Sequence, residues 1–357
     1  MPISASDNVI GKDNKTMKAA VINPWNHVTY ADVPTPELEK DEVLIRVAYT
    51  GICKSDISIF TGSHPIAKAP VIAGHEFSGY VEKINSDAKL PYAVGDKVAG
   101  HITLPCGHCD ACIDGHPNCC RNLRVLGTQT QGTFAEYVKL PISKVYRLPD
   151  DADLRKFALA EPLAVAMYAT QEVGLRVSET VAIIGGGPIG ICCGLIARTA
   201  GASKIVVFEV NPDRAASLRE TFGFTVIDPT KPGAVAEAIA MTDGLGFQRI
   251  YETSASIPGF KMVTALGRVR AHAVIIGITK EPAPLDTWKM MHEEMRLTTI
   301  RVHQQYAYAA ALELVKSGSL DRELMAMITD EFELADAQKA FEFCLNDTKH
   351  IKVLIKS

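Results

Sequence analysis

The sequence lacks the features that mark membrane proteins and nucleic-acid-binding proteins. No uninterrupted apolar run reaches the roughly 20 residues that a membrane-spanning helix needs. The N-terminal residues also lack the apolar stretch of a signal peptide. Positive charge is not in surplus, because 37 Lys and Arg residues stand against 41 Asp and Glu residues. We therefore expect a cytoplasmic protein with reduced thiols and without a nucleic-acid or membrane partner.

Internal repeats and low-complexity segments are missing as well. The chain has 357 residues, of which 47% are hydrophobic, and this suffices for two or three domains with buried cores. The first 150 residues are short alternating runs broken by Gly, Pro and Asp, which favours a mostly β domain. Further on, apolar strand patterns alternate with helical ones, which predicts a doubly wound parallel sheet of about six strands. Its expected strands are 181–184, 204–210, 224–228, 248–254, 273–278 and 297–302.

Cysteine, in contrast, is concentrated in one place. Residues 104–120 hold five of the nine cysteines, at a spacing that lets thiolates on a turning loop converge on one Zn²⁺. Loose buried cysteines or a redox pair are the alternatives, but the flanking Gly, His, Asp and Pro residues are too polar for a core segment. We predict a structural zinc site that needs only four of the five cysteines. Its expected ligands are Cys106, Cys109, Cys112 and Cys120.

A second possible metal site comes from two short motifs, "TGICKSD" at 50–56 and "AGHEFSG" at 73–79. They supply Cys53, His75 and Glu76, and one thiolate, one imidazole and one carboxylate form a plausible zinc set. Taken alone, the cysteine could be a small buried residue and "GHE" an ordinary loop. Glu161 stands among apolar residues, where an ionised carboxylate needs a partner, and a metal is one candidate.

A glycine-rich motif follows the first expected strand of the second domain. The residues "GGGPIG" at 185–190 fit G-x-G-x-x-G, whose glycines bring backbone close to a pyrophosphate at a helix N-terminus. Glu209 lies 19 residues further on and suits the ribose 2′-hydroxyl, so NAD is preferred over NADP. Arg214 could pair with a 2′-phosphate, but we favour a place over the adenine or in solvent. The predicted cofactor-binding residues are Gly185, Gly187, Pro188, Ile189, Gly190, Glu209 and Arg214.

Together these motifs resemble the zinc-dependent medium-chain alcohol dehydrogenases from Met17 to the end of the chain. The resemblance rests on "GICKSD", "GHEFSG", "VGDKVAG", "CGHCDACIDGHPNCC", "GTFAEYVKL", "AEPLAVA" and "GGGPIG". Within the family, "GHE" and "EPLAV" are similar to the branch of sorbitol, threonine, butanediol and sugar-acid dehydrogenases. The implied organisation is an N-terminal extension at 1–16, a chaperonin-10-like (GroES-like) catalytic domain at 17–162, a Rossmann domain at 163–300 and a return to the catalytic domain at 301–357.

The resemblance also implies roles for single residues. Cys53, His75 and Glu76 would hold a catalytic zinc, with Glu161 as a near or exchanging fourth ligand. Ser55 would pass the alcohol proton outward, and Asp56 would orient His75.

Two positions depart from the family pattern. Ser58 replaces a histidine of the proton relay, so proton exit by that route is in doubt. Val302, between Arg301 and His303, replaces the arginine of sorbitol dehydrogenases, which makes sorbitol itself a poorer candidate. His303 could reach substrate or could pack at the domain interface.

The leading hypothesis is therefore an enzyme that transfers hydride from a secondary alcohol of a polyol or sugar acid to NAD, giving a ketone. The alternatives are a threonine or vicinal-diol dehydrogenase and, in a different class, a non-catalytic dinucleotide-binding protein. The family resemblance further implies two zinc ions per subunit and a homo-oligomer, either a tetramer or a dimer.

Overall fold

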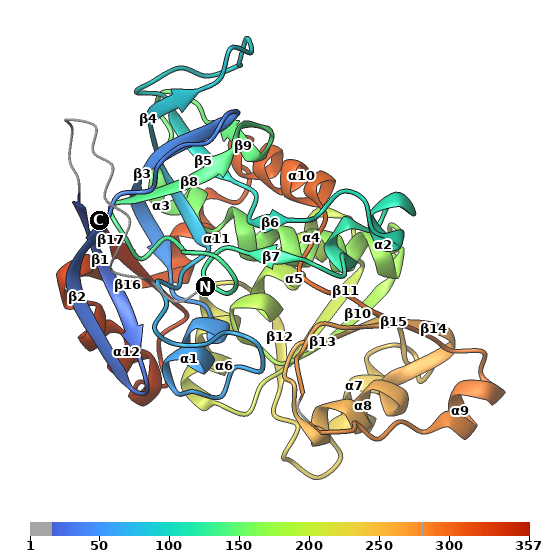
Figure 1. Cartoon of the computed structure of the whole chain (residues 1–357). Helices are drawn as coiled ribbons and strands as arrows, with labels where there is room; N and C mark the ends of the chain where they lie inside the picture. Colours follow the sequence, from blue (N-terminus) through green and yellow to red (C-terminus); the bar gives the residue numbers. More distant parts are fainter. Residues whose placement is uncertain (1–15, 280) are drawn as a thin grey trace. The chain divides into compact units, whose positions relative to one another are not determined.

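The computed structural model describes residues 16–279 and 281–357 (Figure 1). The expected extension at 1–16 thus lies outside the described residues, apart from Thr16, which begins the first strand. The chain forms two compact units, and the second comprises Pro162–Leu314 and Ser319–Met327. The sequence predicts a return to the first unit from residue 301 on, whereas the structure keeps the chain in the second unit up to Leu314, because most of α10 (Gln305–Lys316) belongs there.

The first unit is built on a seven-stranded sheet in the order β16-β17-β3-β4-β5-β9, with β8 also paired to β3. β3 (Glu42–Gly51) lies between β17 (Lys352–Lys356) and β4 (Glu76–Asn85) and is antiparallel to both. The other strands are β1 (Thr16–Asn23), β2 (His27–Pro34), β5 (Lys97–Gly100), β6 (Thr103–Leu104), β7 (Arg124–Val125), β8 (Tyr137–Pro141), β9 (Val145–Arg147) and β16 (Ile328–Glu333). The helices are α1 (Lys54–Phe60), α2 (Asp110–Ile113), η1 (Pro117–Cys119), η2 (Ile142–Lys144), α3 (Leu154–Ala158), η3 (Leu334–Asp336) and α12 (Ala337–Asn346).

An aromatic cluster fixes α1 in this unit. The ring of Phe341 on α12 lies 5.1 Å from that of Phe60 at the end of α1 and 5.5 Å from that of Phe134, and all three are fully buried. Burying one such side chain stabilises a fold by about 1.5–3 kcal/mol. The C-terminal helix therefore holds the helix whose N-terminus carries Cys53.

The second unit contains the predicted parallel sheet, in the order β12-β11-β10-β13-β14-β15. This is the doubly wound Rossmann order, whose direction reverses between β10 and β13. The sequence predicted each of its strands. They are β10 (Thr180–Ile184), β11 (Lys204–Phe208), β12 (Thr225–Ile227), β13 (Phe247–Glu252), β14 (Gly267–Ile275) and β15 (Arg296–Thr299). The remaining helices are α4 (Ala160–Val173), α5 (Pro188–Thr199), α6 (Pro212–Glu220), α7 (Ala234–Ala240), α8 (Ile257–Leu266), α9 (Thr287–His292) and α11 (Asp321–Met327).

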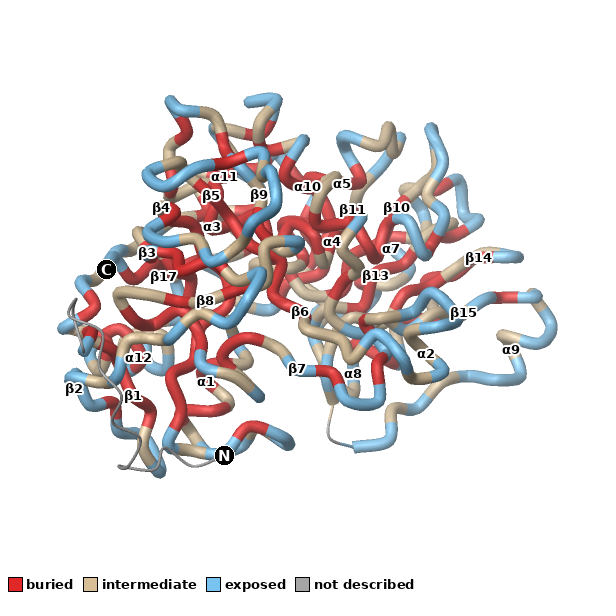
Figure 2. Tube along the Cα trace, turned by 45° about the horizontal axis from the view of Figure 1, so that its top comes forward, coloured by how far each residue is buried: buried red, intermediate tan, exposed pale blue. Residues whose placement is uncertain are grey.

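Burial explains why these strands were recognisable. Buried positions are concentrated along β10, β11 and β13, the central strands of the sheet (Figure 2), and both-sided burial selects continuous apolar runs. β14 begins six residues before its expected start, through a bulge in its pairing with β13. Over the residues that the structure describes, no helix is long and apolar enough to cross a bilayer.

Candidate metal and cofactor sites

Asp56 links the two segments that carry the possible catalytic metal ligands. Cys53 precedes α1, and its backbone N–H donates to Asp56 Oδ2 at 2.8 Å. The other carboxylate oxygen of Asp56 accepts the backbone N–H of Gly74 at 3.1 Å, next to His75. Asp56 is fully buried, and these two donors stabilise its charge in the absence of water. One side chain thereby fixes the backbone beside both Cys53 and His75.

The structure brings Cys53, His75 and Glu76 together. One ligand atom of each lies within 4.8 Å of those of the other two, close to the edge of about 3.3–3.8 Å that a tetrahedral zinc site requires. Thiolate, imidazole and carboxylate are ligands that zinc accepts, so these residues fit the metal.

The environment of His75 agrees with a metal role. Its Nδ1 atom lies 3.5 Å from Asp56 Oδ1, too far for a hydrogen bond. Burial alone lowers the pKa of His75, but the negative charges of Asp56 and Cys53 raise it well above its usual range. The negative charges around this imidazole therefore favour a cation at this place, either a proton on the ring or a metal ion bound to it.

Lys352 lies in none of the sequence motifs, although it is in direct contact with Glu76. Its Nζ atom donates to Glu76 Oε1 at 2.8 Å and to Oε2 at 2.7 Å, and both side chains are buried. Burial raises the pKa of Glu76, Lys352 opposes this change, and the charge of Glu161 adds to it. Glu161 is itself buried but lies outside the group of converging ligand atoms. The available signal was a lysine within the otherwise apolar strand "IKVLI".

The relay residues have different environments. Ser55 is half-buried in the first turn of α1. Ser58 turns its hydroxyl back onto its own helix, where it donates to the Lys54 carbonyl at 3.1 Å.

Val302 and His303 lie after β15. Val302 has φ +52°, which is strained for a β-branched residue. The His303 ring is fully buried and stacks on Tyr308 with ring centroids 5.7 Å apart. The His303 ring thus packs within its own unit.

The four expected cysteines of the first cluster also come together. The Sγ atom of Cys109 lies 3.5 Å from that of Cys112 and 3.8 Å from that of Cys120, close to the edge of about 3.8 Å of a tetrahedral zinc–sulphur site. Cys106 belongs to the same group, whereas Cys119 is exposed and outside it. Backbone N–H groups lower the pKa of the Cys109 thiol to about 6, which favours the thiolate that a metal binds.

The glycine-rich turn joins β10 to α5 in the second unit. Gly185 has φ +103°, a conformation that glycine adopts without strain. A side chain at Gly190 would clash with the Gly185 carbonyl oxygen, so only glycine permits this close packing of helix and turn. At Gly187, the residue before α5, an added Cβ would meet no atom within 4 Å. Pro188 and Ile189 form the first turn of α5, so open space remains beside a helix N-terminus, as a pyrophosphate requires.

Glu209 follows β11 and is already engaged by several partners. Its Oε2 atom accepts the backbone N–H of Gly186 at 3.0 Å, and its Oε1 atom accepts that of Asn211 at 2.8 Å. The guanidinium of Arg214 donates to the same carboxylate at 2.9 and 3.3 Å. The structure therefore places Arg214 on Glu209, a contact that the sequence analysis did not foresee.

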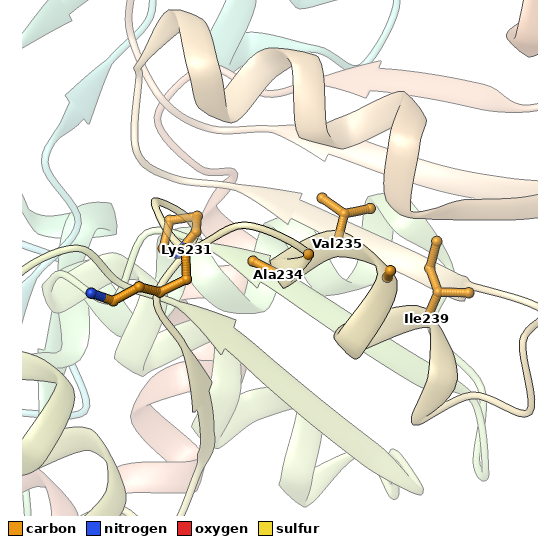
Figure 3. A pocket seen from close by; sticks show the side chains of 7 residues that line it. Lys231, Ala234, Val235 and Ile239 are labelled. Atoms are coloured by element: carbon orange, nitrogen blue, oxygen red, sulfur yellow. The ribbon is translucent and has the colours of Figure 1, made fainter.

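A separate hollow of about 430 Å³ lies at the start of α7 (Figure 3). Val235 and Ile239 lie along the same side of the helix, whereas the Lys231 amine extends away from them. None of the residues predicted to bind metal or cofactor lines this hollow.

Comparison with known proteins identifies the family. The alcohol dehydrogenase GroES-like domain matches residues 39–150, and the zinc-binding dehydrogenase domain matches residues 188–317. D-arabitol-phosphate dehydrogenase of Enterococcus avium is 32% identical over 351 residues, which cover 96% of this chain and 98% of that protein. The chain belongs to the zinc-dependent medium-chain alcohol dehydrogenase family. The resemblance inferred from the motifs is thereby confirmed, and so is the combination of a GroES-like domain with a Rossmann domain.

Other similar proteins show how broad this alcohol dehydrogenase family is. L-threonine 3-dehydrogenase of Rhizobium etli is 32% identical over 316 residues, which cover 87% of this chain and 90% of that protein. A solved structure from Sinorhizobium meliloti, assigned as a zinc-binding dehydrogenase and bound to NADP, has a TM-score of 0.88 at 29% identity and covers 96% of this chain and 100% of its own. The reaction class of the alcohol dehydrogenase is therefore clear, whereas its relatives differ in substrate.

Proposed function

We propose that this alcohol dehydrogenase oxidises a secondary hydroxyl of a polyol or sugar acid to a ketone, with NAD as hydride acceptor. The observation that carries the proposal is the convergence of Cys53, His75 and Glu76 within 4.8 Å. The same chain offers a Rossmann turn with a buried Glu209 beside it.

The site residues of the first unit have different proposed roles. Cys53, His75 and Glu76 would hold zinc, with Glu161 as a near or exchanging fourth ligand. When bound, zinc lowers the pKa of the alcohol hydroxyl and stabilises negative charge on its oxygen. Asp56 fixes the backbone at Cys53 and next to His75 through the hydrogen bonds described above. Ser55 would accept the hydroxyl proton at its Oγ atom and pass its own hydroxyl proton outward to water.

The second unit determines the cofactor. The Glu209 carboxylate accepts the adenosine ribose hydroxyls and repels a 2′-phosphate, which favours NAD. Arg214, the nearby cation that could attract that phosphate, is held on Glu209 by an ion pair. The four-cysteine lobe holds a second, structural zinc through Cys106, Cys109, Cys112 and Cys120.

The polyol assignment is supported by the similarity to D-arabitol-phosphate dehydrogenase. L-threonine is the second candidate substrate, because a threonine dehydrogenase is equally identical in sequence. Val302, in place of an arginine, argues against sorbitol itself.

We further propose a cytoplasmic homo-oligomer, a tetramer or a dimer. None of the nine cysteines forms a disulfide, which suits a reducing compartment. In the described part of the chain β15 pairs only with β14, so its outer edge can accept a strand of another subunit.

The test is NADH formation, followed by absorbance, with hexitols, pentitols, their phosphates, aldonic acids, L-threonine and 2,3-butanediol. NADP is tested in parallel, and each reaction is repeated after zinc chelation. Turnover of a polyol or sugar acid with NAD that is abolished by chelation supports the proposal, whereas preference for threonine selects the second candidate.

Two cysteine variants complete this test. Cys53→Ser should abolish turnover, and Cys119→Ser, which changes an exposed cysteine outside both groups, should not. Unchanged turnover in Cys53→Ser would refute the zinc mechanism.

A further inference from the structure

A buried ion pair joins a proposed zinc ligand to the C-terminal strand of the first unit. Glu76 begins β4 and Lys352 begins β17, with β3 between these strands in the sheet. The Lys352 ammonium contacts both oxygens of Glu76 and also donates to the Ile52 carbonyl at 3.2 Å. Only 3% of Lys352 and 1% of Glu76 is exposed, so water does not screen this pair.

Gly51 makes this contact possible. It lies at the end of β3, directly opposite Glu76 in the strand pairing. A Cβ atom at position 51 would collide with Glu76 Oε2. Because glycine has no side chain, the Glu76 carboxylate extends across the end of β3 to Lys352.

The pair matters because of the number of negative charges beside it. Cys53 as thiolate, Glu76 and Glu161 carry three negative charges, and the buried Asp56 adds a fourth, so Zn²⁺ alone leaves a surplus of two. Burying an uncompensated charge is unfavourable. The ammonium of Lys352 reduces this surplus at the Glu76 carboxylate, which it contacts directly.

We propose that Lys352 is a positioning residue that competes with zinc for the Glu76 carboxylate. With both oxygens on Lys352, Glu76 is withheld from the metal, and a position is left for Glu161 or for the alcohol. With one oxygen released, Glu76 acts as the third ligand. Lys352 thereby keeps Glu76 an exchangeable ligand, which turnover requires. The inference rests on the proposed zinc site and adds a residue that controls it.

The first experiment measures zinc affinity in the full-length protein by competition with a chelator. Cys53-dependent zinc is the zinc that is absent from Cys53→Ser. Lys352→Met removes the competing cation, so the dissociation constant of this zinc should fall at least tenfold. The turnover number kcat should also fall at least tenfold. A merely structural lysine gives the opposite sign, because a loosened site binds zinc more weakly. Lys352→Arg keeps the charge and should restore affinity to within threefold of the original. Unchanged or weaker zinc binding in Lys352→Met overturns the proposal.

Cobalt substitution adds a spectroscopic measurement. The visible absorption of Co²⁺ at the Cys53 site is obtained by subtracting the spectrum of Cys53→Ser, which keeps the four-cysteine site. Lys352→Met should change this spectrum, because Glu76 becomes a permanent ligand. The matched control is Lys356→Met on the same strand, whose lysine is half-exposed and pairs with Glu333, and it should leave spectrum and affinity unchanged. A spectrum that is identical in Lys352→Met and the original protein overturns the proposal.

A double variant covers the case in which Lys352→Met alone fails to fold. Glu76→Gln with Lys352→Met contains neither buried charge and should fold. If Lys352 acts through Glu76, adding Lys352→Met to Glu76→Gln should change the zinc dissociation constant by less than threefold, and a larger change overturns the proposal. Absence of any Cys53-dependent zinc from the original protein would refute the proposed function as well. Cys53-dependent zinc without a response to Lys352 would refute only this inference.

Discussion

Replacing Asp56 by asparagine tests whether one buried carboxylate organises the metal site. Its two oxygens accept the backbone N–H groups of Cys53 at 2.8 Å and of Gly74 at 3.1 Å. Asparagine has a single side-chain oxygen, so one donor loses its acceptor and faces an NH₂ group. A hydrogen bond to a charged group contributes about 1.5–3 kcal/mol and a buried unsatisfied donor costs a similar amount, so the free energy of unfolding should fall by about 2–4 kcal/mol. Urea unfolding of the zinc-free protein, followed by circular dichroism, measures this change.

Zinc affinity should also fall in Asp56→Asn, by about 10- to 100-fold, because the backbone beside two ligands is no longer fixed. Asp153→Asn is the matched control in the same unit. Asp153 caps α3 by accepting the backbone N–H of Arg155 at 3.1 Å, and its side chain is 38% exposed. Asparagine caps helices as well as aspartate does, so this variant should lose less than about 1 kcal/mol and keep its zinc affinity. The reasoning fails if both variants lose the same stability, or if zinc affinity in Asp56→Asn stays within threefold of the original.

Three further predictions concern other parts of the chain. Glu209→Gln leaves the Arg214 guanidinium without its carboxylate, so the ratio of kcat/KM with NADP to kcat/KM with NAD should rise at least tenfold in steady-state assays. An unchanged ratio would show that Glu209 does not determine cofactor choice. Val302→Gly should raise the free energy of unfolding by about 1 kcal/mol in thermal melts, because glycine adopts the positive φ without strain; an unchanged melting temperature would show that the site is not strained. Cys112→Ser should lower the zinc content, measured by atomic absorption, by one atom per chain, whereas Cys119→Ser should not. Equal zinc contents in these two variants would disprove the four-cysteine site.

The parallel sheet was readable from the sequence because its central strands are short apolar runs buried on both faces. The start of β14 was not, since residues 267–272 include three basic side chains and join the strand through pairing with Phe247 and Arg249 of β13. The position at which the chain returns to the first unit was also missed, because the apolar face of α10 does not reveal which core it packs on. The start of β14 and the unit to which α10 belongs are determined by tertiary contacts, which the local sequence pattern does not specify.

In the candidate site, sequence found the residues that occur in short motifs and missed those that depend on distant partners. Cys53, His75 and Glu76 lie in two local motifs of fixed spacing. Lys352 is 276 residues away from Glu76, so only the folded sheet reveals their contact. Arg214 was close enough in sequence to be noticed, but whether it pairs with Glu209 depends on the turn between β11 and α6.

The two groups of possible metal ligands differ in what supports them before any metal arrives. Asp56 and the aromatic cluster around α1 fix the backbone of the first group through the fold itself. The four-cysteine lobe has only short helices: α2 has four residues, none of them buried, and η1 has three, of which Asn118 is buried. We therefore expect the lobe to take up its zinc as the chain folds. We expect the Cys53 position, in contrast, to be emptied and refilled in the folded protein, so that its occupancy would follow the supply of metal throughout the lifetime of the molecule.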